Sequence, residues 1–306
     1  MPNNYWRERE EEHIRKSIKN DAKLTKRLRQ KYIDAMNEIQ EQIEAFYGRY
    51  ASREGISMDE ARKRIGKLDM KKYERKAKRY VKKKTFTQRA NEEMRLYNAS
   101  MRINRLQLLR LNIELELLAL ISDEERFLMQ ELTKQARAEY ERQSGILGQT
   151  INYNEKNLEA IVNASFLTAT WSDRLWSNQN ALRAELDKLL NRGIVRGLNP
   201  RELARELRKT FNTSIYNSER LLRTELARVQ GDVAIDSFKK ADFKQYVWIT
   251  EPDGCPICKK LDNKVFDLED AQVGINYIPR HPNCRCSVSA YMDRDEWDAD
   301  LRRRGL

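Results

Sequence analysis

The chain has 306 residues, and its 11 glycines and 6 prolines leave little room for a turn-rich fold, so long helices should dominate. An excess of 59 Lys and Arg over 47 Asp and Glu gives a net charge of +12, which favours an acidic partner, either nucleic acid or an electronegative protein surface. No apolar signal peptide opens the chain, which predicts folding in a reducing cytosol.

The first predicted element is one long helix over residues 8–50. Apolar residues recur there at steps of three and four with charged residues between them, which is the pattern of an amphipathic helix. His13 lies near its start, far along the chain from every cysteine. We expect His13 to be a surface side chain rather than a metal ligand.

A basic stretch over residues 62–84 follows a capping box at Ser57-Met58-Asp59-Glu60. Aromatic residues lie between its cations, so the stretch could follow a phosphate backbone. The alternative is a solvated helix face whose tyrosines pack inward, and this alternative is slightly favoured. The candidate nucleic-acid-binding residues are Lys71, Lys72, Lys78, Lys82 and Lys83.

Residues 90–144 form the strongest predicted helix. Within 106–121 apolar residues lie on two opposite faces, which predicts that this helix packs between neighbours at the centre of a bundle. Arg110, Glu114 and Glu116 interrupt any span of about 20 apolar residues, so a transmembrane helix is excluded here.

A linker is predicted at residues 143–148, where two glycines occur in a glycine-poor chain. We therefore expect a helical bundle over 1–145, a second domain over 149–292 and a charged tail over 293–306. The second domain should contain three helices. They begin near Ser172-Asp173, at Asn199-Pro200 and at residue 217, and they end near 192, 211 and 240.

The pattern changes after Ala241. Residues 246–250 and 286–291 are rich in aromatic and β-branched residues, which predicts two short strands. Two strands alone are marginal in water, so another interaction must stabilise them. The predicted fold is mainly α, with an N-terminal helical bundle and a C-terminal helical domain that ends in a small zinc-stapled β element.

Metal donors cluster between these strands, because all four cysteines and one of the two histidines fall there. Short turns that carry thiolate and imidazole groups suit a structural zinc ion. Cys255 and Cys258 form a Cys-x-x-Cys pair that can fold back on one ion. The other two ligands come from His281, Cys284 and Cys286, and we favour His281 with one of the two cysteines.

Two other states of these residues are disulfides and free thiols. A reducing cytosol argues against disulfides, and the clustering argues against free thiols. A catalytic zinc site usually has three protein ligands beside a general base, and no glutamate stands next to His281.

Several short motifs lie upstream of these donors and around them. Upstream are an asparagine-proline helix start and an arginine-threonine-glutamate motif, and downstream are motifs on either side of the cysteine turn. They are Asn199-Pro200, Arg223-Thr224-Glu225, Trp248-Ile249-Thr250, Asp253, Leu261-Asp262-Asn263, Val265-Phe266, Pro279 and His281-Pro282-Asn283-Cys284-Arg285-Cys286.

This set resembles the phage Mu protein F-like family of minor head proteins over roughly residues 160–292. The resemblance implies a tailed-phage virion protein near the portal, which is needed for head assembly or infectivity. Asn263 departs from the family pattern, in which glycine is usual, and this departure bears on the geometry of its turn. The family attaches no reaction to Arg223 and Glu225, and ion pairing or helix packing is expected for them.

The sequence shows no glycine-rich phosphate loop, no Ser/His/Asp set and no carboxylate pair with a plausible reaction, so no enzyme is predicted. The first hypothesis is a minor head protein in the virion, in the head interior or at the portal vertex, made in the bacterial host cytoplasm. Its expected partners are the portal protein, packaged DNA and capsid or scaffold proteins, with no membrane and no small-molecule substrate. The alternatives are a zinc-containing nucleic-acid-binding protein and, third, a zinc-dependent nuclease.

Overall fold

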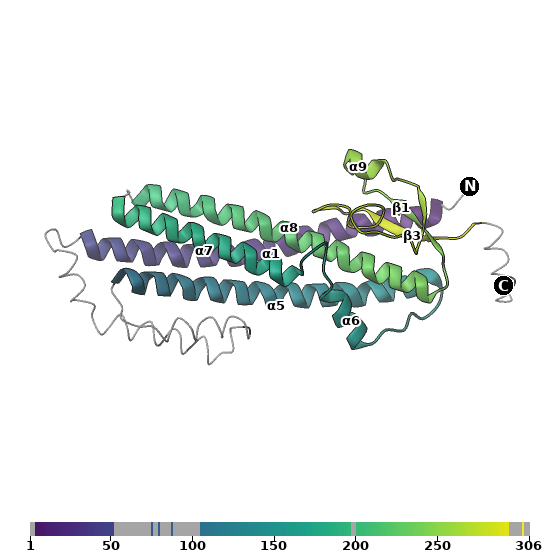
Figure 1. The fold of residues 1–306 in the computed structure, drawn as a ribbon, viewed down its shortest axis with the longest axis horizontal. Helices are drawn as coiled ribbons and strands as arrows, with labels where there is room; N and C mark the ends of the chain where they lie inside the picture. The colour runs from purple at the N-terminus through teal and green to yellow at the C-terminus, as the bar shows by residue number, and fades with distance from the viewer. Residues whose placement is uncertain are drawn as a thin grey trace. The chain divides into compact units, whose positions relative to one another are not determined.

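The computed structural model describes residues 4–51, 105–196 and 200–293, together with positions 75, 79, 87 and 302. These residues are mainly helical and end in a small sheet, so the predicted fold class is confirmed (Figure 1). The elements are α1 (Asn4–Ala51), α5 (Arg105–Leu147), α6 (Glu155–Val162), α7 (Trp171–Arg196), α8 (Pro200–Lys240), β1 (Gln245–Ile249), α9 (Pro256–Lys259), β2 (Val265–Asp267) and β3 (Ser287–Tyr291).

The chain folds into two compact units, each built from stretches that are far apart in the sequence. The first unit combines Met1–Thr25, Leu128–Trp171 and Arg220–Leu306, and the second combines Lys26–Phe127 with Ser172–Glu219. Both units draw on segments from either side of the expected linker at residues 143–148. The division into domains at 1–145 and 149–292 stays a prediction, and the charged tail over 293–306 falls almost wholly outside the described residues.

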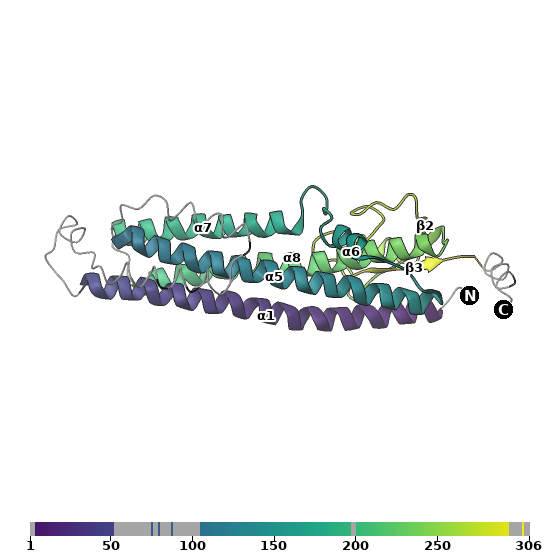
Figure 2. The same cartoon turned by 90° about the horizontal axis from the view of Figure 1, so that it is seen from below.

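Helices α1, α5, α7 and α8 run side by side where they form the second unit (Figure 2). The α5 segment is buried on both of its apolar faces, as predicted for a helix packed between neighbours. None of the described helices is both long and apolar enough to cross a bilayer. The buried residues of the two faces are Leu109, Ile113, Leu117 and Leu120 on one side and Leu108, Leu115 and Leu118 on the other.

Two predicted helix boundaries are wrong. Residues 200–240 form the single helix α8 instead of two helices that break between 211 and 217. No proline or glycine occurs between residues 211 and 217, and the burial of Phe211 and Ile215 keeps this part helical. Helix α7 begins at Trp171, so Ser172 lies inside it and donates a hydrogen bond to Glu125 at 2.9 Å instead of capping the helix.

The sheet has the strand order β2-β1-β3, and both pairs are antiparallel. The two predicted strands are β1 and β3, which pair so that Trp248 lies opposite Val288. Strand β2 was not predicted, because three residues are too few to show an alternating pattern. Tyr246 of β1 stacks on Phe266 of β2, with ring centroids 5.6 Å apart.

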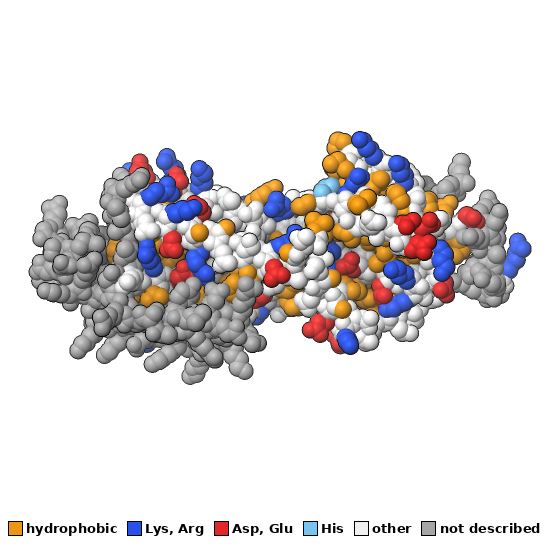
Figure 3. All heavy atoms as spheres, in the orientation of Figure 1, with side chains coloured by type: hydrophobic (Ala, Val, Ile, Leu, Met, Phe, Trp, Pro, Cys, Tyr) orange, Lys and Arg blue, Asp and Glu red, His pale blue; other side chains and the backbone are white. Residues whose placement is uncertain are grey.

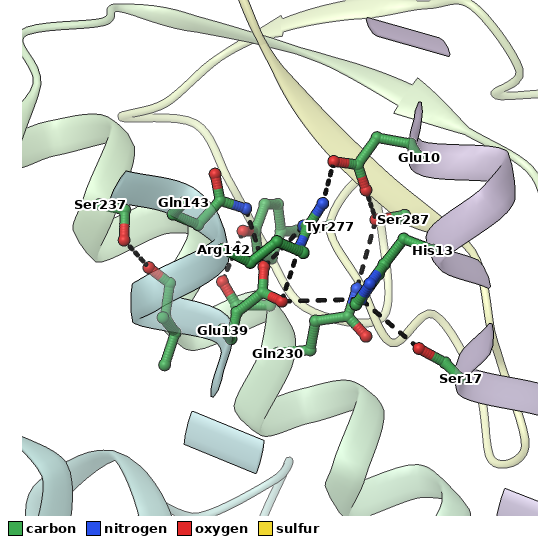
Figure 4. A network of polar contacts seen from close by, with 12 residues as sticks. Glu10, His13, Ser17, Glu139, Arg142, Gln143, Gln230, Ser237, Tyr277 and Ser287 are labelled. Atoms are coloured by element: carbon green, nitrogen blue, oxygen red, sulfur yellow. Dashed lines mark hydrogen bonds and ion pairs between the residues drawn. The ribbon is translucent and has the colours of Figure 1, made fainter. Parts of the chain in front are cut away.

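His13 is not a surface side chain, contrary to the prediction. Its side chain is 19% exposed, and its Nε2 lies 3.6 Å from the buried carboxylate of Glu139 in a polar network of the first unit (Figure 4). Burial, followed by the charge of Arg142, lowers the pKa of His13 to about 4. The imidazole is therefore neutral at pH 7 and acts as a hydrogen-bonding group within the core.

A buried carboxylate also lies inside the second unit. The Tyr32 hydroxyl donates to Glu124 Oε2 at 2.7 Å, and the same hydroxyl lies 2.7 Å from the Ser218 hydroxyl. Burial raises the pKa of Glu124 to about 7, although the hydrogen bonds from Tyr32 and Ser218 act in the opposite direction. Helices α1, α5 and α8 each contribute one member of this group.

This carboxylate should make the second unit less stable as the pH rises. In the unfolded chain Glu124 ionises near its usual value of about 4.3, whereas the folded protein holds its proton up to about pH 7. The free energy of unfolding should fall across this window by roughly 3–4 kcal/mol, at about 1.4 kcal/mol per pKa unit. Glu124→Gln should remove this pH dependence. The free energy of unfolding of the variant should then match that of the wild type near pH 5 and exceed it near pH 8.

Urea unfolding at the two pH values measures this difference. Glu185→Gln is the matched control, because Glu185 lies exposed on α7 and pairs with the neighbouring Lys188. A wild-type midpoint that does not move between pH 5 and pH 8 would contradict the role assigned to Glu124.

Candidate metal centre

The candidate metal centre lies in the first unit, between the end of β1 and the start of β3. Strand β1 leads through a tight turn into α9, whose first flanking residue is Cys255 and whose third helical residue is Cys258. The turn needs glycine at position 254, because a Cβ there would lie 2.3 Å from Thr250 Cγ2 and 2.9 Å from the Glu251 carbonyl oxygen.

Two short turns present the donors. In the first, the N–H of Lys259 donates to the Cys255 carbonyl at 3.0 Å, which brings both cysteines to one side. In the second, the N–H of Cys284 donates to the His281 carbonyl at 3.1 Å. Asn283 takes a left-handed φ of 67° there, which asparagine tolerates better than most residues.

The side chains of the two turns converge. His281 Nε2 lies 3.2 Å from the Sγ atoms of both Cys255 and Cys258, and Cys258 Sγ lies 4.0 Å from Cys284 Sγ. The donors form two groups that share Cys258. One group holds Cys255, Cys258 and His281, and the other holds Cys258, Cys284 and Cys286.

All five predicted donors are thus brought together, and these distances fit a tetrahedral ion. Bonds of about 2.3 Å to sulfur and about 2.0 Å to nitrogen place neighbouring sulfurs about 3.8 Å apart, and sulfur about 3.5 Å from nitrogen. The four thiols are free in the structure, and a Cys258–Cys284 distance of 4.0 Å is far from the roughly 2.05 Å of a disulfide. The two groups could therefore hold a metal ion.

The histidine is oriented for ligation through Nε2. Its Nδ1 lies 2.9 Å from the Pro282 carbonyl oxygen, to which the Nδ1–H donates, so the lone pair of Nε2 is directed at the sulfurs. Burial lowers the pKa of His281, but the Pro282 carbonyl and the Cys284 and Cys255 thiols together raise it above the ordinary value.

Two thiols are biased toward the thiolate form. The backbone N–H of Cys258, together with that of Ile257, directs a hydrogen bond at the sulfur of Cys255 and lowers its pKa. The pKa of Cys284 is lowered as well, first by the Cys258 thiol and then by the Cys286 thiol. Thiolate is the form that binds metal.

A set of polar contacts holds the cysteine turn against β1. Trp248 Nε1 donates to Thr250 Oγ1 at 3.0 Å, and that hydroxyl donates to the Cys258 carbonyl at 3.1 Å. The Thr250 N–H donates to Asp262 Oδ1 at 2.8 Å. Asn263 adopts a φ of 61°, so it provides the left-handed turn for which glycine is usual, and its N–H donates to the Trp248 carbonyl.

The arginine-threonine-glutamate motif supports the second turn from α8. The hydroxyl of Thr224 accepts a hydrogen bond from the N–H of Asn283 at 3.0 Å. Glu225 forms a fully buried ion pair with Arg228 at 2.6 Å, so the expected ion pairing of this glutamate is observed. Thr224 is therefore the member of the motif that braces the metal segment.

The surface around α9 combines apolar and basic side chains (Figure 3). Ile257 is 54% exposed at the tip of the cysteine turn, and Lys259 and Lys260 are exposed beside it. Arg280 bridges the two turns by donating to the Ile257 carbonyl at 2.7 Å.

The predicted nucleic-acid-binding residues lie outside the described part of the chain. This holds for Lys71, Lys72, Lys78, Lys82 and Lys83 and for nearly all of the 62–84 stretch, of which positions 75 and 79 alone are described. Their role stays a prediction.

Residues 184–289 match the family described as Phage Mu protein F like protein. This part of the chain is similar to that family. The matched residues, called the Mu F-like segment from here on, include all five donors and the whole of α8. The match begins later than the expected start near residue 160. Comparison with curated proteins and with solved structures gave no match.

Similarity to this family suggests a structural protein of the phage head and a place in the virion. Gly254 and Glu251 were not predicted to have a role, although a glycine beside the first cysteine of a glycine-poor chain is a visible signal. Side chains of α1 that reach this segment gave no comparable signal, because they are separated from it by more than 230 residues (Asp21 and Arg285 are 264 apart).

The brace from α8 can be tested by removing one hydroxyl. Thr224→Val should leave the N–H of Asn283 without its acceptor and destabilise the first unit by roughly 1–2 kcal/mol. Thr224→Ser keeps the hydroxyl and serves as the control. Urea unfolding of the two variants measures the difference, and equal midpoints would show that the Thr224 hydroxyl does not support the turn.

Proposed function

We propose that the protein is a non-enzymatic structural component of a tailed-phage head that associates with the portal and carries a structural zinc ion. The observation that carries this proposal is the convergence of five thiol and imidazole donors on two turns inside the Mu F-like segment. The protein then resides in the head interior or at the portal vertex, and in the host cytoplasm during assembly. Packaged DNA and capsid or scaffold proteins are its further partners.

Zinc is the metal that this donor set favours, because thiolate and imidazole ligands in tetrahedral positions are typical of structural zinc sites. We assign Cys255, Cys258, His281 and Cys284 as the four ligands. These residues form two matching turns with a spacing of three, and the distances between their donor atoms, 3.2 and 4.0 Å, approach those of a tetrahedral site. Cys286 is then a neighbouring thiol beside a closed site.

A structural role agrees better with the surroundings of the donors than a catalytic one. Cys258 and Cys284 are buried, so their side of the site has no access for a substrate. The nearby carboxylate of Glu251 accepts the N–H of Arg285 at 3.1 Å, which commits it to holding the backbone instead of activating water.

Cys258→Ser is the sharpest test, because Cys258 belongs to both donor groups. Protein purified under reducing conditions should contain about one zinc per chain, and the variant should lose the zinc together with co-purification of the portal protein. Cys286→Ser is the matched control and should keep both. Metal analysis gives the first readout, and pull-down with the portal protein of the same phage gives the second.

The two readouts separate the parts of this proposal. Wild-type protein without zinc would contradict the proposed metal binding. If Cys286→Ser lost the zinc and Cys284→Ser kept it, the fourth ligand would be Cys286 and not Cys284. Zinc-loaded protein that does not bind the portal would remove the proposed partner.

Binding of nucleic acid is the second candidate function, and one surface of α1 favours it. Arg15, Lys19 and Lys23 follow one another at steps of four, so they lie on one face of the helix about 6 Å apart along its axis. All three are exposed. A row of one sign suits a phosphate backbone.

Changing Arg15, Lys19 and Lys23 together to glutamine should weaken binding of duplex DNA, whatever its sequence. The log–log dependence on salt should become shallower by roughly 0.9 per lost phosphate contact. The control changes the exposed Lys134, Lys156 and Lys239 to glutamine and alters the net charge equally. Equal loss in both variants would mean that the net charge, and not this row, governs binding.

A further inference from the structure

Arg285 lies between Cys284 and Cys286, and hydrogen bonds hold both its backbone N–H and its guanidinium. The N–H of Arg285 donates to Glu251 Oε1 at 3.1 Å. Its guanidinium forms a two-point contact with Asp21, with Nε 2.5 Å from Oδ2 and the second nitrogen on Oδ1. Both charged side chains are almost fully buried, so the pair is shielded from solvent and salt.

Asp21 belongs to α1, far outside the Mu F-like segment. It lies on the buried face of that helix, where Arg223 of α8 approaches the same carboxylate at 3.7 Å. One carboxylate of α1 thus lies between the arginine of the metal segment and an arginine of the supporting helix. Removing that carboxylate would leave a buried guanidinium without its counterion.

Two further contacts join α1 to the same segment. Arg7 donates to Asp262 Oδ2 at 3.1 Å and to Asn263 Oδ1 at 2.6 Å, just after the cysteine turn. The hydroxyl of Ser287, the residue after Cys286, donates to Glu10 at 2.7 Å (Figure 4). Residues 7, 10 and 21 therefore hold the segments next to both donor turns.

We propose that α1 is part of the metal site and that Asp21 is its positioning residue. Through Arg285, Asp21 fixes the backbone that carries Cys284, so this ligand is already in place when the metal binds. This inference rests on the proposed binding of metal. Its physical basis is preorganisation, since a ligand segment that is ordered beforehand loses less conformational freedom on binding.

The coupling must act in both directions. If the docking of α1 raises metal affinity, metal binding must stabilise the docking of α1 by the same factor. Metal removal should therefore loosen residues 7–21 of α1 as well as the two turns, although the contacts of α1 are to residues beside the donors.

The first experiment measures cobalt affinity by the thiolate absorption that develops when reduced, metal-free protein is titrated with Co²⁺. Asp21→Asn should weaken binding by about tenfold or more, the range found when outer partners of metal ligands are lost. The matched control is Glu225→Gln, which breaks a buried ion pair of the same unit. Its arginine partner bonds the carbonyls of Ile161 and Val162 and not the metal segment.

A second variant covers the case in which Asp21→Asn does not fold. Asp21→Leu combined with Arg285→Met removes both charges together, which often leaves stability nearly unchanged. Hydrogen exchange of the α1 amides over residues 8–25 is then compared with and without Zn²⁺. The wild type and Glu225→Gln should show slower exchange with Zn²⁺, and the double variant should show no such difference.

The outcomes are distinguishable. Wild-type protein that gives no cobalt spectrum would remove the proposed metal binding and this inference with it. A wild type that binds cobalt, with Asp21→Asn equal to it, would overturn the inference alone. An equal loss in Asp21→Asn and Glu225→Gln would also overturn it, because the effect would then be general destabilisation and not positioning.

Discussion

Buried guanidinium groups determine how the first unit is assembled. A buried charge is tolerated only when it is paired and its hydrogen bonds are satisfied. Arg228 meets this requirement through Glu225, Asp232 and two main-chain carbonyls of residues 161 and 162, and Arg285 meets it through Asp21. Arg142 meets it through Glu139 and Glu10. Each arginine therefore selects one arrangement of its neighbours, because any other arrangement would leave a charge unpaired in the core.

This constraint explains how so small a sheet can be ordered. Strands of three to five residues cannot bury enough apolar surface by themselves. The sheet is supported on one side by α8, where Tyr277 donates to the Gly231 carbonyl at 2.7 Å and Thr224 accepts from Asn283. An ion bound between the two turns would join the ends of β1 and β3 through side chains and would stabilise the same segment from within.

The sequence predicts those features that depend on residues close together in the chain. The long amphipathic helices, the two-faced segment of α5 and the donor cluster all follow from spacing, and the structure confirms them. The break near residue 211 was wrong because tertiary burial of Phe211 maintains a helix that local propensity alone leaves marginal. His13 was misplaced for a related reason, since a polar residue in a charged helix gives no sign that it faces a buried carboxylate. Such contacts depend on pairings across more than 100 residues, which one sequence does not reveal.

The same pairings bear on how much of the chain the Mu F-like segment needs in order to fold. Within residues 184–289, Arg285 and Ser287 direct their side chains to Asp21 and Glu10, and Arg228 bonds the carbonyls of residues 161 and 162. A fragment that begins at residue 149 keeps the contacts of Arg228 but buries Arg285 without its carboxylate. The cost of that unpaired charge is several kcal/mol, comparable with the whole stability of a small domain. Residues 4–25 of α1 therefore belong to the folding unit of the metal segment, although the chain separates them from it by more than 200 positions.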